Sequence, residues 1–65
     1  MNNKQEFIGL SKKESQNLAE RENLIYRLIR IDEKSFQTYP LNNDIRDDRI
    51  CIEIDNHQVT KAIIS

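Results

Sequence analysis

The feature that most restricts the fold of this chain is a pair of strand-like runs separated by a long polar segment. Residues 49–55 alternate isoleucine with more polar residues, and this period of two predicts a half-buried strand. Residues 24–31, LIYRLIRI, are rich in β-branched and aromatic types and are apolar on both faces, which predicts a central strand. The segment 32–48 between them shows no helical period. A segment of this kind inside a small domain is usually functional or disordered.

The length of the segment 32–48 allows the two strands to run parallel. A parallel pair needs a connection of about a dozen residues or more, and this segment supplies it without a crossover helix. Pro40 stiffens the segment and disfavours a helical backbone at Tyr39. We therefore expect the connection to pass along the edge of the sheet as an extended, exposed arc.

A short helix is predicted before the first strand. Ser11 followed by Glu14 has the spacing of a capping box, in which the two side chains satisfy backbone N–H groups at a helix start. Helix-forming residues fill positions 12–22. The apolar face of this helix is thin, so the helix needs another surface to pack on.

A hairpin is predicted after the second strand. Asn56 and His57 form its turn, because asparagine tolerates a left-handed backbone, and residues 58–64 then pair antiparallel with residues 49–55. The predicted core is Ile8, Leu18, Ala19, Tyr26, Leu28, Ile50, Ile52, Ile54, Val59 and Ile63, with Ile25 and Ile29 as alternatives to Tyr26 and Leu28.

The elements together predict an α+β fold. A single helix packs on a small mixed β-sheet, and a long exposed loop lies between the two central strands. Residues 1–6 are expected to be a disordered polar lead-in, and residues 7–65 a single domain.

Size and charge narrow the classes of function. A chain of 65 residues forms one domain with a small core and has no room for a deep catalytic cavity, so we expect a binding module and not an enzyme. Ten basic and eleven acidic residues give a net charge of −1, which is not the basic footprint of a protein that binds nucleic acid or an anionic membrane.

The single cysteine excludes an internal disulfide. The N-terminal residues lack the apolar run of a signal peptide, so we expect a cytoplasmic protein.

The polar residues do not indicate a catalytic or metal site. Asp44, Asp47 and Asp48 are interpreted as a solvated acidic turn, because the spacing and central glycine of an EF-hand are absent. His57 is expected to be an exposed turn residue, and Cys51 a plain strand thiol. We therefore expect no cofactor, no bound metal and no catalytic residue.

The stretch DIRDDRICIEID, residues 44–55, resembles the potato inhibitor I family of serine protease inhibitors, especially its short bacterial and fungal branch. The resemblance lies in an ordered pattern of residue types. The pattern is an acidic residue (Asp44), a hydrophobic residue (Ile45), Arg46, any residue, Asp48-Arg49, an alternating apolar strand (Ile50, Ile52, Ile54) and a closing Asp55. IGLSKKESQNLAE is similar to the family's helix opening, and QVTKAI to its last strand. The resemblance extends over residues 7–64.

The resemblance implies a fold and a function. It implies a potato inhibitor I-like fold that presents an extended loop to the active-site cleft of a subtilisin- or chymotrypsin-like serine protease, in the manner of a substrate. It further implies a reactive bond near Asn43–Asp44, with Arg49 and Arg46 as supports beneath the loop. The implied partner-binding loop consists of Pro40, Leu41, Asn42, Asn43, Asp44 and Ile45.

One alternative keeps the fold without the protease. Asn43 stands where large apolar side chains are usual in the family, and the chain has no disulfide. Both features favour a non-inhibitory protein-interaction module, such as a phage- or plasmid-borne blocker of a host protein. In either case the expected partner is a protein.

Overall fold

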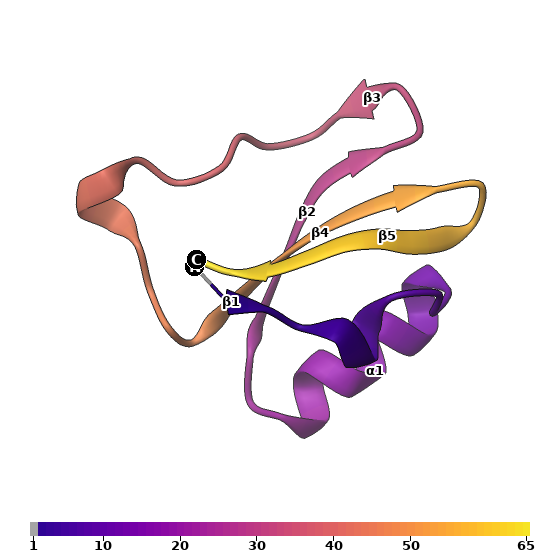
Figure 1. Cartoon of the computed structure of the whole chain (residues 1–65), viewed down its shortest axis with the longest axis horizontal. Coiled ribbons are helices and arrows are strands. Elements are labelled where there is room, and N and C mark those ends of the chain that lie inside the picture. Colours follow the sequence, from indigo (N-terminus) through magenta and orange to yellow (C-terminus); the bar gives the residue numbers. More distant parts are fainter. Residues whose placement is uncertain (1) are drawn as a thin grey trace.

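The computed structural model describes residues 2–65 and consists of one helix and a five-stranded mixed sheet with the order β1-β5-β4-β2-β3 (Figure 1). The α+β class, with one helix packed on a mixed sheet, is confirmed. The elements are β1 (Asn2–Asn3), the 3-10 turn η1 (Gln5–Phe7), α1 (Lys12–Arg21), β2 (Ile25–Ile31), β3 (Lys34–Ser35), the 3-10 turn η2 (Asn42–Asp44), β4 (Arg49–Asp55) and β5 (Gln58–Ile64).

The central strands β2 and β4 run parallel, and this arrangement requires the long connection between them. Ile25 at the start of β2 pairs with Arg49 at the start of β4, so the chain must return along the whole sheet after β2 ends. It forms β3 beside the end of β2, then passes through η2 to the start of β4 (Figure 1). The exposed loop expected between the two central strands is confirmed for residues 36–48, whereas Lys34–Ser35, expected to belong to that loop, pair with β2 as β3.

The helix α1 begins at the predicted capping box. The Glu14 backbone N–H donates to Ser11 Oγ at 3.1 Å, and the Ser11 N–H donates to Glu14 Oε1 at 3.0 Å. Asn23 ends the helical course with a left-handed φ of 59°. The fully buried Ser15 hydroxyl lies 2.8 Å from the Tyr26 hydroxyl and fixes the helix against β2.

The core lies between α1 and one face of the sheet, which we call the helix face. Tyr26 and Leu28 of β2 pack against this core, so the first of the two predicted registers is confirmed. The buried residues that form the core are Phe7, Ala19, Ile50, Ile52, Ile54, Val59, Ala62 and Ile64.

Two residues of the predicted core lie elsewhere: Ile63 is buried, at 8% exposed, but on the other face of the sheet, and Ile8 is exposed. The β4–β5 register shifts after the Glu53–Lys61 pair, so that Val59 pairs with Ile54, and this bulge interrupts the alternation. Ile63 therefore lies beside Cys51 on the opposite face, which we call the loop face. Ile8 is 42% exposed, and Phe7, at the end of η1, is buried in its place.

The structure of residues 2–6 differs from the expected disordered lead-in, and residue 1 lies outside the described residues. Asn2 pairs with Ile64 and Asn3 with Ile63, and the Lys4 N–H donates to the Ala62 carbonyl at 2.9 Å. The edge of a strand exposes backbone N–H and carbonyl groups that need hydrogen-bond partners. Residues 2–4 supply such partners to β5.

Candidate functional site

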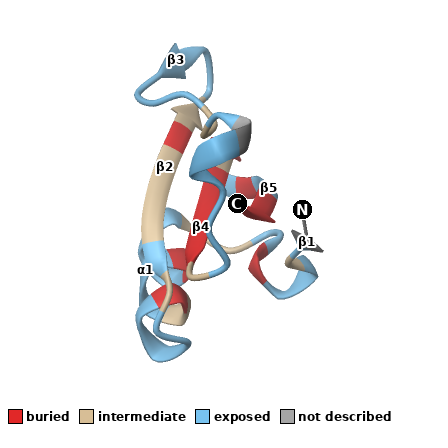
Figure 2. Ribbon diagram, turned by 90° about the vertical axis from the view of Figure 1, so that its left-hand side faces the viewer, coloured by how far each residue is buried: buried red, intermediate tan, exposed pale blue. Residues whose placement is uncertain are grey.

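The loop 36–48, between β3 and β4, is the candidate functional site. Figure 2 shows it largely exposed, in contrast to the buried strand β4 that follows. Leu41 is 77% exposed and Ile45 52% exposed, so this loop presents apolar side chains to solvent. Such side chains are available to a binding partner because the core does not use them.

The backbone of this loop is extended only on either side of a turn. Residues 42–44 form η2, in which the Asp44 N–H donates to the Leu41 carbonyl at 2.8 Å. Leu41, with φ −70° and ψ 163°, and Ile45, with φ −76° and ψ 133°, are extended. The structure thus differs from the extended backbone expected throughout 40–45. The physical reason is that asparagine and aspartate are strong turn formers.

Arg49 fixes the second leg of the loop, which leads into β4. This residue is 7% exposed, and its side chain donates from Nη2 to the Asp44 carbonyl at 2.6 Å and from Nε to the Ser65 carbonyl at 2.8 Å. The Asp44 carboxylate is 63% exposed and lies 3.8 Å from Arg49 Nη1. Arg49 therefore holds the backbone of Asp44 more closely than its side chain.

Arg46, the second expected support, forms a different contact. Its guanidinium donates to both carboxylate oxygens of Asp48, at 2.9 and 2.8 Å. The hydrogen bond from Arg46 lowers the pKa of Asp48, and the same bond raises the pKa of Arg46. The Asp48 carbonyl accepts the Ile25 N–H at 2.8 Å, so this pair lies at the approach to β4, beyond residues 40–45.

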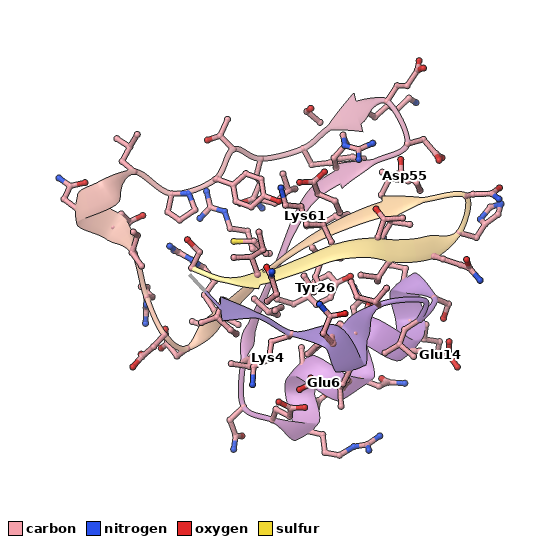
Figure 3. All side chains as sticks on the ribbon, in the orientation of Figure 1. Lys4, Glu6, Glu14, Tyr26, Asp55 and Lys61 are labelled. Carbon is pink, nitrogen blue, oxygen red and sulfur yellow. The ribbon has the colours of Figure 1, made fainter. Side chains whose placement is uncertain are left out.

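The first leg of the loop is fixed to the sheet by contacts of Tyr39 and Thr38. The Tyr39 hydroxyl donates to the Glu53 carboxylate of β4, and Arg27 of β2 donates to the Thr38 carbonyl at 3.1 Å. The Lys61 ammonium lies 5.5 Å from the centre of the Tyr39 ring, within cation–π range. In Figure 3 Lys61 lies toward the loop, whereas Tyr26 lies toward α1.

Glu53 connects this leg to a charged network on the loop face. Arg30 donates to Glu53 at 3.0 and 3.1 Å and to Asp55 at 2.7 and 2.9 Å. The hydrogen bond from Tyr39, followed by that from Arg30, holds the pKa of Glu53 below its usual range. Burial, followed by the bond to Glu53, raises the pKa of Tyr39. Glu53 is 14% exposed, so Tyr39 is fixed to a carboxylate that is itself held in place.

The other chemical groups on the strands are not arranged for reaction. Cys51 is fully buried, and this burial raises the pKa of its thiol. His57 is an exposed residue of the β4–β5 turn, as predicted, and has a left-handed φ of 68°. Within residues 2–65, no group of three His, Cys, Asp or Glu side chains is placed to hold a metal ion.

Comparisons with protein-family models, with curated proteins and with solved structures gave no match. No helix within residues 2–65 combines the length and the apolar character needed to span a membrane. The contacts that hold the loop 36–48 are therefore the observations from which a function is inferred.

Proposed function

We propose that this protein is a small protease-inhibitor-like binding protein that presents residues 40–45 to the active-site cleft of a serine protease in a substrate-like manner. The supporting observation is an exposed loop with both legs fixed to the sheet. Tyr39 is bound by Glu53 on one side, and the Asp44 carbonyl is bound by Arg49 on the other. A loop that is already ordered loses less conformational entropy when it binds.

The same contacts account for inhibition in place of digestion. When a protease cuts a flexible peptide, the two product ends diffuse apart. Here both ends would stay attached to the sheet through Tyr39 and Asp44, so the new amine stays close to the new acyl group. Closely held reactants recombine at a high effective concentration, which favours re-formation of the bond.

The proposal includes a potato inhibitor I-like fold. It is supported by the parallel pair of β2 and β4, by the long loop between them, and by the arginine at the start of β4 that lies beneath that loop. We also place the protein in the cytoplasm, a setting that suits a chain with one cysteine and no internal disulfide.

A second candidate function is favoured by the turn η2. Proteins that bind a peptide by adding it to a sheet edge take it as an extended strand, whereas residues 42–44 form a 3-10 turn. In this alternative the loop binds another protein in its turn conformation. The protein is then a non-inhibitory interaction module on the same fold, such as a phage- or plasmid-borne blocker of a host protein.

The proposal is tested by titrating subtilisin and chymotrypsin with the purified protein and analysing each mixture by mass spectrometry. We expect inhibition, with the chain either intact or cut once within residues 40–45. Full protease activity beside a chain that stays folded and uncut would contradict the proposal and favour the interaction module. Full protease activity together with rapid digestion of the loop would also contradict the proposal, because a loop held in place by the sheet should resist cleavage.

A matched pair of variants locates the binding surface. Ile45 in the loop is 52% exposed, and Ile8 outside it is 42% exposed. Ile45→Ala should weaken inhibition by about 5-fold or more, because a contact side chain is lost, whereas Ile8→Ala should leave inhibition unchanged. Equal effects of the two substitutions would mean that the loop is not the contact surface.

A further inference from the structure

We infer that Leu41, and not Asn43, enters the primary specificity pocket of the partner, and that the partner is a serine protease whose pocket accepts a branched apolar side chain. This inference rests on the proposed function and names the specificity residue of the same loop. The reactive bond is then Leu41–Asn42. The resemblance to the inhibitor family implies a bond further along the chain, at Asn43–Asp44.

The first reason is the exposure of Leu41. It is 77% exposed, which makes it the most exposed large apolar residue in the described part of the chain. Transfer of such a side chain from water to an apolar pocket is favourable. Asn43 carries an amide instead, which loses its hydrogen bonds to water when it is buried and needs new partners. An apolar pocket therefore selects Leu41 over Asn43.

The second reason is the course of the backbone. A cleft that takes its ligand as an added strand needs the residues before the reactive bond to be extended. Pro40 has a restricted φ and biases Tyr39 toward an extended conformation, and Leu41 is extended with ψ 163°. Residues 39–41 thus meet the requirement. Residues 41–43 do not, because the chain enters η2 after Leu41.

The third reason is the position of Leu41 between fixed points. Glu53 holds Tyr39 on one side of the Leu41–Asn42 bond, and Arg49 holds the Asp44 carbonyl on the other. The Asp44 N–H also donates to the Leu41 carbonyl, so a hydrogen bond of 2.8 Å spans the bond itself.

These contacts also act on the products of a cut. Hydrolysis at this position breaks one C–N bond, consumes one water, and leaves a carboxylate on Leu41 and an amine on Asn42. Both new ends stay close to each other, because Tyr39 and Asp44 remain bound to β4. The loop is therefore expected to be cut slowly and to be rejoined.

The experiment measures inhibition of chymotrypsin by the full chain and by Leu41→Ala and Asn43→Ala, and identifies the cut bond by mass spectrometry. Both side chains are exposed, so both variants should fold, which circular dichroism verifies. We expect a cut at Leu41–Asn42, a loss of about 30-fold or more in Leu41→Ala, and a loss of under about 5-fold in Asn43→Ala.

A gain of function separates a pocket role from a structural one. Trypsin has an acidic specificity pocket, whereas that of chymotrypsin is apolar. Leu41→Lys should therefore transfer inhibition from chymotrypsin to trypsin, and Asn43→Lys should not. Inhibition of trypsin by Asn43→Lys, or a cut at Asn43–Asp44, overturns the role of Leu41 and leaves the proposed function standing. Absence of inhibition by the unaltered chain overturns the proposed function, and this inference with it.

Discussion

The two faces of the sheet are built from different chemistry. The helix face is closed by the isoleucines of β4, which are at most 2% exposed and pack beneath α1. The loop face also buries Cys51 and Ile63, but beside them it carries Arg30, Glu53 and Asp55, whose contacts extend to the loop through Tyr39. The comparison indicates that the two faces have different roles. Apolar burial on the helix face stabilises the fold, and polar contacts on the loop face determine the shape of the loop.

The largest effect is expected from a substitution on the helix face. Ile52 is fully buried at the centre of β4, so Ile52→Ala removes buried methyl groups and leaves a cavity. The free energy of unfolding should fall by about 2–5 kcal/mol, measured by urea denaturation. In a domain this small that loss is a large part of the total stability.

Ile25→Ala is the matched control for this substitution. Ile25 lies on the neighbouring strand β2, but its side chain is 47% exposed. A change at an exposed site should alter the free energy of unfolding by no more than about 0.5 kcal/mol. If the two alanine variants were equally unstable, the helix face would not be the principal source of stability.

A smaller effect is expected from Tyr39→Phe on the loop face. This variant loses one hydrogen bond to Glu53 and keeps the ring beside Lys61. At neutral pH the free energy of unfolding should fall by about 1 kcal/mol. Inhibition should weaken as well, because the first leg of the loop is released. A stability loss as large as that of Ile52→Ala would break the proposed division between the faces.

The cost of Tyr39→Phe should also depend on pH. Because the folded-state pKa of Glu53 lies below its unfolded value, its contribution to stability is present above the unfolded pKa of about 4.3. That contribution is lost as the pH falls through the lower folded pKa. The hydrogen bond from Tyr39 is the largest cause of this shift, so the parent and Tyr39→Phe should converge in stability at acid pH. Parallel pH profiles for the two proteins would contradict this role of Tyr39.

The helix face was largely predictable from the sequence, because periodic burial leaves a periodic pattern. The alternating isoleucines of β4, the capping box at Ser11 and the turn at Asn56 each gave a local signal. One exception, Ile63, follows from the bulge between β4 and β5. A bulge exchanges the faces of all later residues, so that Ile63 lies on the loop face, and no residue type marks its position.

The contacts of the loop face were much less predictable. Tyr39 and Glu53 are far apart in the sequence and meet only because β2 and β4 run parallel. Arg46 and Arg49 look equivalent in the sequence, but Arg49 belongs to β4 and reaches beneath the loop, whereas Arg46 precedes the strand. The pairing of Asn2–Asn3 with β5 uses backbone groups, so their side chains gave no signal.

The most direct test of the central claim, that contacts from the sheet fix the loop, is a measurement of backbone ¹⁵N order parameters for residues 41–45. The measurement compares the parent with three variants: Arg49→Ala, Arg49→Lys and Arg46→Ala. Arg49→Lys keeps the charge but loses the planar guanidinium that reaches two carbonyls. The amides of β5 report whether each variant remains folded. We predict order parameters of about 0.85 in the parent and in Arg46→Ala, and below about 0.6 in both Arg49 variants. Equal order in all four proteins would contradict the claim.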